Sequence, residues 1–122
     1  MNLHAYWRSV LDQNASEMRK YFHENARIQW HNTNECFTKE AFICANCTYP
    51  GAWAGEIQRV EGTGDAPITV VHVYAKNEPC SFHVTSFFRI SQGKIVTLDE
   101  YWGDDGPPPQ WRQDMGLSTP VE

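Results

Sequence analysis

The sequence predicts an α+β domain in which three N-terminal helices pack on one face of a curved sheet. Two observations carry this prediction. Helical spacing of apolar residues dominates the first 49 residues, whereas alternating strand patterns fill most of the remainder. The turns between those later strands are too short for anything but antiparallel pairing. The length of 122 residues suits one domain with its own core and leaves no room for a second.

The chain begins with an amphipathic helix, because five apolar residues recur at helical spacing. These residues are Leu3, Tyr6, Trp7, Val10 and Leu11. Asn2 is suited to cap the start of this helix, and the pair Asn14 and Glu17 has the spacing that opens a second, short helix. The apolar residues of the second helix are Met18, Tyr21 and Phe22.

A strand and a third helix come next. Residues 26–32 alternate in polarity, which is typical of a strand with one buried side. The apolar side of this strand carries Ala26, Ile28 and Trp30. Thr38 is a suitable cap for the third helix, and Pro50 with Gly51 ends it.

Four antiparallel strands are predicted at residues 55–61, 68–75, 81–91 and 94–102, separated by turn-forming segments. They complete one domain over residues 1–104. The Pro-rich tail at residues 105–122 cannot continue a strand, because its three successive prolines remove backbone donors. We expect this tail to pack on the domain or on a partner subunit, through contacts such as that of Trp111.

Composition excludes several classes of function. The formal net charge of -5 and the sequence pI near 5.5 disfavour binding to nucleic acid. No apolar run approaches the roughly 20 residues of a membrane span, and no signal-peptide core precedes the first helix. The cytoplasm is therefore the expected compartment.

Cys44 and Cys47 have the spacing of a redox pair or of half a zinc site. Zinc needs a second pair at ligand spacing, but Cys36 and Cys80 are isolated in the sequence. Both residues of the pair also lie well inside the predicted third helix. We therefore expect them to be structural, with no metal and no cofactor.

Glu100 interrupts the apolar face of the last strand. Val96, Leu98 and Trp102 share that face, so an inward Glu100 would lose its solvation and its pKa would rise. The alternative is that Glu100 lies at the strand end and reaches solvent or pairs with an arginine.

The neighbouring strand repeats the pattern, because Phe82, Val84, Ser86 and Phe88 share the more apolar face. Ser86 is then the polar exception, unless it is only a small residue bonded to a carbonyl. His72 and His83 fall on the opposite, aromatic-rich face. That face predicts a homodimer formed through the sheet.

Two motifs carry a resemblance to a known group. They are Tyr21-Phe22 followed by Asn25-Ala26, and Gly93-Lys94-Ile95-Val96 leading to Glu100-Tyr101-Trp102. The chain from residue 2 to about 104 resembles the nuclear transport factor 2-like superfamily, which includes SnoaL-like polyketide cyclases, ketosteroid isomerase and scytalone dehydratase. The resemblance implies a strongly curved, mostly antiparallel sheet that forms a cone around an apolar cavity, and commonly a dimer.

The resemblance also implies what stands at the functional positions of the family, residue by residue. Tyr6 stands where ketosteroid isomerase has its oxyanion-stabilising tyrosine. Trp30 stands where that enzyme has its aspartate base, and Ser86 lies near the place of its second acid, so steroid isomerisation is not expected. Glu100 stands where many SnoaL-like proteins carry an acid.

We therefore expect a pocket for a small apolar or aromatic molecule, with Glu100 as general acid or base and Tyr6 as donor to a carbonyl. The expected ligand-binding residues are Trp7, Trp30, Asn32, Val84, Ser86, Leu98 and Trp102. The implied reaction would be of isomerase, dehydratase, cyclase or hydrolase type. His31 is a rival base that strand alternation directs toward the surface. The alternative function is a non-catalytic ligand-binding or dimeric accessory module.

Overall fold

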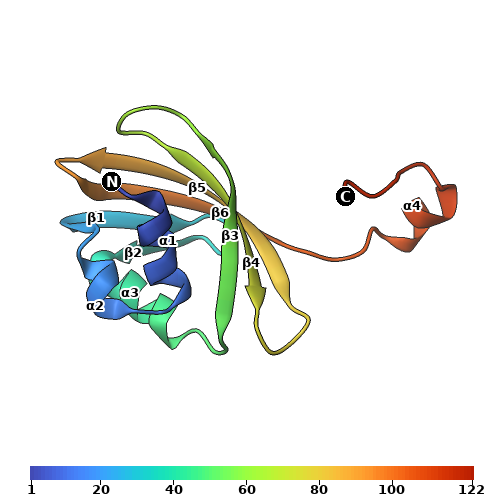
Figure 1. The fold of residues 1–122 in the computed structure, drawn as a ribbon, viewed down its shortest axis with the longest axis horizontal. Coiled ribbons are helices and arrows are strands. Elements are labelled where there is room, and N and C mark those ends of the chain that lie inside the picture. Colours follow the sequence, from blue (N-terminus) through green and yellow to red (C-terminus); the bar gives the residue numbers. More distant parts are fainter.

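The computed structural model describes residues 1–122 and has the α+β architecture that the sequence predicts (Figure 1). Its elements in chain order are α1 (Leu3–Leu11), α2 (Ala15–Arg19), β1 (Phe22–Trp30), β2 (Glu35–Thr38), α3 (Lys39–Thr48), β3 (Trp53–Glu61), β4 (Ile68–Ala75), β5 (Ser81–Ser91), β6 (Lys94–Asp104) and α4 (Gln110–Met115). No helix is long and apolar enough to cross a membrane.

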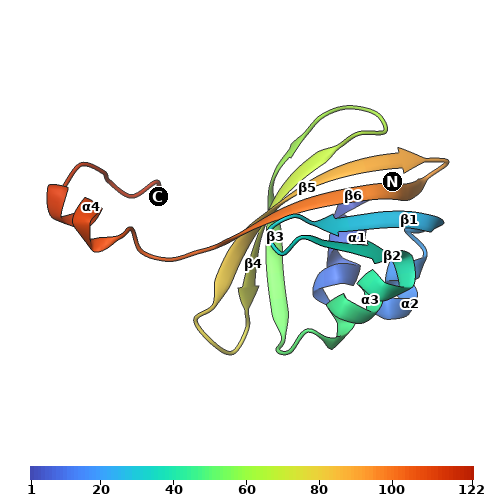
Figure 2. The ribbon, with the colours of Figure 1, turned by 180° about the vertical axis from the view of Figure 1, so that it is seen from behind.

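The six strands form one sheet in the order β2-β1-β6-β5-β4-β3. Every neighbouring pair is antiparallel except β1 and β6, which run parallel. Seen from opposite sides, the sheet bends around α1, α2 and α3, which lie together on its concave side (Figures 1 and 2). This is the curved, mostly antiparallel sheet with three covering helices that the sequence predicts.

The N-terminal half differs from the prediction in two places. The strand β1 spans Phe22–Trp30 rather than residues 26–32, and it begins early because Phe22 already pairs with Ile95 before the register shifts between Phe22 and Arg27. Phe22 therefore belongs to the sheet and not to the second helix, which ends at Arg19. The edge strand β2 was not predicted, since its four residues show no burial alternation that a pattern could reveal.

The side chains of β5 and β6 point to the predicted faces of the sheet, except near a second register shift. Phe82, Val84, Ser86 and Phe88 all turn inward, as do Leu98, Glu100 and Trp102. Ile95 is also fully buried, although simple alternation places it on the outer face. The reason is a bulge between Arg89 and Ile90, which rotates the start of β6 relative to the rest of the strand.

Tyr6 lies at the centre of the core. Its ring makes edge contacts with four other aromatic rings, at centroid distances of 5.6 to 5.8 Å. These partners are Trp7, Tyr21, Phe22 and Phe88. The contacts join α1 to β1 and β5, so helix packing and sheet curvature depend on each other.

The helix α1 also approaches the backbone of the far strands at Gly55. A Cβ at this position would lie 2.6 Å from the carbonyl oxygen of His72 and 3.3 Å from Leu11. Only glycine allows this close approach of β3, β4 and α1.

Candidate functional site

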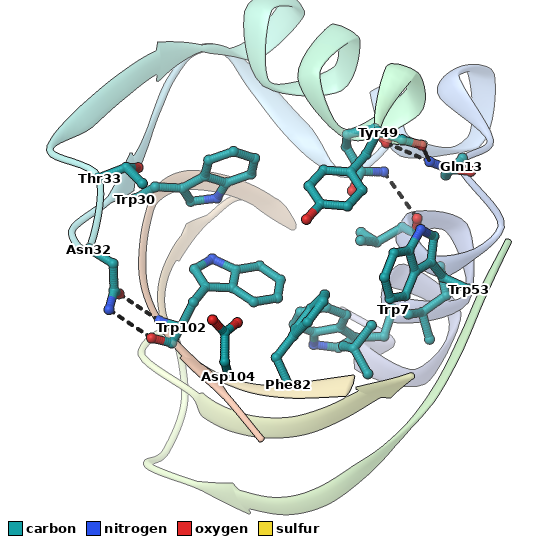
Figure 3. Close-up of a pocket in the computed structure, with 14 residues that line it drawn as sticks. Trp7, Gln13, Trp30, Asn32, Thr33, Tyr49, Trp53, Phe82, Trp102 and Asp104 are labelled. Atoms are coloured by element: carbon teal, nitrogen blue, oxygen red, sulfur yellow. Dashed lines mark hydrogen bonds between the residues drawn. The ribbon is translucent and has the colours of Figure 1, made fainter. Parts of the chain in front are cut away.

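A cavity of about 360 Å³ opens at the wide end of the cone, between the helices and the far ends of β3, β5 and β6 (Figure 3). Most of the lining side chains are hydrophobic. The lining residues are Trp7, Val10, Leu11, Gln13, Trp30, Asn32, Thr33, Asn46, Tyr49, Trp53, Val73, Phe82, Trp102 and Asp104.

Four tryptophans from different elements form the aromatic walls. Three of their indole N–H groups are already engaged in hydrogen bonds. Trp7 donates to Thr69 Oγ1 at 3.2 Å, and Trp53 donates to the carbonyl of Pro50 at 3.0 Å. Trp30 donates to Glu100 Oε1 at 3.1 Å. These bonds fix the wall, because each indole is held at its polar edge.

Trp102 is the exception among the four. Its Nε1 atom is buried and has no hydrogen-bond partner. Its ring packs edge-on against Phe82 at 4.8 Å and against Trp30 at 6.2 Å. A buried donor without an acceptor is costly, by about 1–3 kcal/mol, so this atom is the least satisfied polar group of the wall.

The polar residues at the rim hold the backbone. Asn32 donates to the carbonyl of Trp102 and accepts from its backbone N–H, both at 2.7 Å (Figure 3). Gln13 donates to the carbonyls of Asn46 and Tyr49 at 2.9 and 2.7 Å. These amides therefore position Trp102 and the end of α3 around the mouth of the cavity.

A row of polar side chains lies deeper in the cone. Strand register places Trp30, Glu100, Ser86 and Thr69 side by side across β1, β6, β5 and β4. Ser86 Oγ donates to Glu100 Oε2 at 2.5 Å, which complements the bond from Trp30 to the other oxygen. Thr69 and Ser86 are fully buried. Thr69 carries no signal in the sequence, since a threonine is common in any strand.

Glu100 is only 2% exposed. Burial raises the pKa of its carboxyl from 4.5 to about 7, although the hydrogen bonds from Ser86 and Trp30 act to lower it. The predicted inward orientation and raised pKa of Glu100 are therefore present. The alternative of a solvent-reaching carboxylate is wrong.

Tyr6 is fully buried, and its hydroxyl has no hydrogen-bond partner. Burial, together with the nearby charge of Glu100, raises the pKa of Tyr6 well above its usual range. The opening helix thus directs a neutral phenol toward the interior of the cone.

The structure divides the predicted site residues into two sets. Trp7, Trp30, Asn32 and Trp102 line the cavity. The other five lie beneath it and do not line it: Tyr6, Val84, Ser86, Leu98 and Glu100. Register explains the separation for Ser86, Leu98 and Glu100, because Trp102 is one inward-facing step beyond Glu100 along β6, or about 7 Å.

Several wall residues were not predicted. Trp53, Tyr49, Phe82 and Val73 come from segments whose patterns indicate only core packing. They come from β3, β4, β5 and the end of α3, which meet only in the folded chain, and no local motif records that meeting. The glycine at position 55, which permits the close approach, is the one sequence signal nearby.

His31 lies on the surface, as expected. Its Nε2 atom lies 2.8 Å from Asp99 Oδ1, and its ring stacks on Tyr101 at 4.4 Å. It does not line the cavity. Of the four cysteines, Cys44 is exposed and Cys47 contacts Met18, and all four are free thiols.

A second polar cluster lies on the outer face of the sheet, at the end of β6. His83 Nδ1 is 2.5 Å and His72 Nε2 3.3 Å from the two oxygens of Asp105. Partial burial acts to raise the pKa of Asp105, but hydrogen bonds from Ser81 and His83 outweigh it and lower the pKa. The two imidazoles are stacked with an angle of 22° between their planes. The ligand atoms of His72, His83 and Asp105 all lie within 4.8 Å of one another, which is close enough for the three residues to hold a metal ion.

Comparison with protein-family models and with curated proteins gives no match. Solved structures do match. A candidate ketosteroid isomerase from Kribbella flavida DSM 17836 is similar at 19% identity and a TM-score of 0.79, over 98% of this chain and 87% of that one. A nuclear transport factor 2-like protein of unknown function from Burkholderia xenovorans LB400 is similar at 19% identity and a TM-score of 0.76, over 98% and 92%.

An epoxide hydrolase from M. tuberculosis is similar at 12% identity and a TM-score of 0.69, over 83% of this chain and 79% of that one. The chain therefore has the nuclear transport factor 2-like fold. The two matches that span 98% of the chain include its C-terminal segment as well as the domain. At these identities the likeness concerns the fold, and function has to be argued from the site.

Proposed function

We propose that this protein binds a small, largely apolar molecule in the cavity at the wide end of its cone. The observation that carries the proposal is the aromatic wall with one buried, unpartnered donor, Trp102 Nε1. A volume of about 360 Å³ falls within the range of small-molecule sites, which are mostly apolar with a few placed polar groups. The three other indole N–H groups are engaged, so they contribute shape and apolar surface.

The unpartnered donor defines the chemistry of the ligand further. A ligand oxygen would satisfy Trp102 Nε1, the one indole of the wall that lacks a partner, once the Trp102 ring turns to present this buried atom to the cavity. The rim carries Asp104 and the chain is acidic overall, which disfavours an anionic ligand. We therefore expect a neutral aromatic or alicyclic molecule with a carbonyl or ether oxygen.

A matched pair of probes tests this proposal. The two probes, 2-acetonaphthone and 2-ethylnaphthalene, have similar shapes, but only the first carries an acceptor oxygen. Their dissociation constants are measured by calorimetry. Replacing Trp102 by Phe should reduce the ratio of the two affinities, which favours the ketone, by two- to tenfold, because one hydrogen bond contributes a factor of that size. Trp111→Phe, an exposed tryptophan outside the cavity, is the control and should keep the preference. If neither probe saturates the wild-type protein, the proposal fails.

General acid or base catalysis by Glu100 is the second candidate function, favoured by its buried carboxyl with a pKa near neutrality. The carboxyl meets the wall only through the indole of Trp30. Catalysis therefore requires Trp30 to swing aside or the ligand to replace its hydrogen bond.

A direct assay separates binding from catalysis. A small epoxide such as styrene oxide and a small β,γ-unsaturated ketone are incubated with the protein, and diol or conjugated product is measured. Glu100→Gln should abolish turnover and keep binding of 2-acetonaphthone, whereas the exposed Glu24→Gln should change neither. Turnover that survives Glu100→Gln would exclude Glu100 as the acid or base.

The proposal includes a homodimer that packs through the outer face of the sheet. Tyr74, Phe87 and Tyr101 expose more than two fifths of their surface there, which is a large apolar area for a small domain. It also includes the cytoplasm as the compartment, supported by the four free thiols. Sedimentation equilibrium tests the dimer, for which a mass near twice 14.0 kDa is expected.

A further inference from the structure

The C-terminal arm, defined as residues 106–122, has a defined conformation but makes no hydrogen bond to the domain. It contains the short helix α4, which ends at Gly116 in the left-handed conformation with φ 61°. Its hydrogen bonds are internal, such as Gln113 to the carbonyl of Pro108 at 2.7 Å. Trp111 is 63% exposed and Leu117 72% exposed. Apolar side chains of this size gain free energy when another surface covers them.

The root of the arm is fixed on the outer face of the sheet. The backbone N–H of Asp105 donates to the carbonyl of Ser81 at 3.1 Å, and its carboxylate accepts from Ser81 Oγ at 2.7 Å. His83 and His72 hold the same carboxylate from neighbouring strands. Asp105 therefore sets the direction in which the chain leaves β6.

The arm does not return to its own domain. Pro107, Pro108 and Pro109 follow the root directly, and successive prolines favour a stiff, extended segment. Figures 1 and 2 show the chain running straight away from the sheet, with α4 distant from every other element. The stiff segment separates Trp111 from the surface to which Asp105 is bound.

An aromatic band crosses the outer face next to this root. Its rings form two groups: in one, Tyr101 lies 4.4 Å from His31 and 5.9 Å from Phe87, and in the other, His72 lies 4.7 Å from His83 and 5.5 Å from Tyr74. Asp105 bonds to two members of this band. When two copies meet through these faces, each arm emerges inside the interface.

We propose that the C-terminal arm crosses to a second copy of this chain and covers apolar surface there, with Trp111 as its main contact. The inference rests on the proposed dimer. If a two-fold axis passes through the aromatic band, the arm of each copy reaches the other copy, and the two contacts are identical by symmetry. The matches to the Kribbella and Burkholderia structures cover 98% of this chain, so they extend into the arm.

Photo-crosslinking in the full chain tests the exchange. The photoreactive residue p-benzoylphenylalanine is placed at position 111, and chains labelled with ¹⁴N and ¹⁵N are mixed before irradiation. Crosslinked peptides of mixed isotope composition are expected, because residue 111 contacts the other chain. The same residue at Tyr49, which lies at the cavity mouth, is the control and should give crosslinks within one chain only. Crosslinks from position 111 that are confined to one chain would overturn the exchange.

The dissociation constant of the dimer gives a second, independent measurement. The double substitution Trp111→Ser and Leu117→Ser in the full chain should weaken the dimer at least tenfold, since both side chains lose their apolar contacts. The change lies outside the folded domain, so the circular dichroism of the sheet should not alter. A dimer of unchanged affinity refutes the arm exchange and leaves the sheet interface in place. A wild-type chain that is monomeric at all concentrations refutes both.

Discussion

Replacing Glu100 by glutamine removes the ionisable group while keeping the shape of the side chain. The amide can still accept from Trp30 Nε1 and can donate to Ser86 Oγ, so the local hydrogen bonds persist. What changes is the cost of holding a charge where only 2% of the residue is exposed. This substitution therefore isolates the electrostatic contribution of Glu100 to folding.

The sign follows from the raised pKa. In the unfolded chain the carboxyl ionises near 4.5, whereas in the folded protein it ionises only near 7. Between these values the folded state holds a proton that the unfolded state has released, so the free energy of unfolding falls as pH rises through this window. Each pH unit is worth about 1.4 kcal/mol, so the interval corresponds to about 3 kcal/mol. This decrease in the free energy of unfolding is absent below pH 4.5 and complete above pH 7.

Urea unfolding of the wild type and of Glu100→Gln between pH 4 and pH 8 measures this difference. The variant should match the wild type within about 1 kcal/mol at pH 4 and be more stable by about 3 kcal/mol at pH 8. Glu24→Gln, which removes an exposed carboxylate from β1, controls for the change in net charge and should follow the wild type. A variant that keeps the wild-type pH dependence, or that is less stable at pH 8, would refute the reasoning.

Three further predictions concern the groups around this carboxyl and the walls of the cone. Ser86→Ala removes a hydrogen bond that lowers the pKa of Glu100, so the carboxyl should titrate at a higher pH in carbon NMR; a lower value would contradict the assignment. Gly55→Ala places a Cβ 2.6 Å from the carbonyl oxygen of His72 and should destabilise the fold by about 1–3 kcal/mol in urea. Trp7→Phe leaves buried Thr69 without its donor and should lower the free energy of unfolding in urea by about 1–3 kcal/mol.

Much of the candidate site follows from alternation along single strands. The positions of Glu100 and Ser86 on inward faces are local properties, because successive side chains point to opposite sides of a strand. The amphipathic spacing of α1 likewise places Tyr6 and Trp7 inside. Where a bulge breaks the alternation, as at Ile95, the local pattern gives the wrong face.

The depth of each residue in the cone is not a local property. Glu100 and Trp102 share a face, yet only Trp102 lines the cavity. Glu100 lies where the sheet is fully packed, whereas Trp102 lies one inward-facing step further along β6, at the cavity. Trp53 and Phe82 lie on β3 and β5, two strands apart in the sheet, and their rings meet at a centroid distance of 5.3 Å.

The amino-acid sequence by itself determined the class of fold, the bounds of β4 and β5 and the burial of an acid on β6, since these depend on hydrophobic spacing within one element. Only the tertiary structure decided which tryptophans surround the cavity, which indole lacks a partner, and that the C-terminal arm leaves its own domain. Those features depend on distances between segments far apart in the chain. Such distances are set by packing and sheet curvature, which spacing along a single strand or helix does not encode.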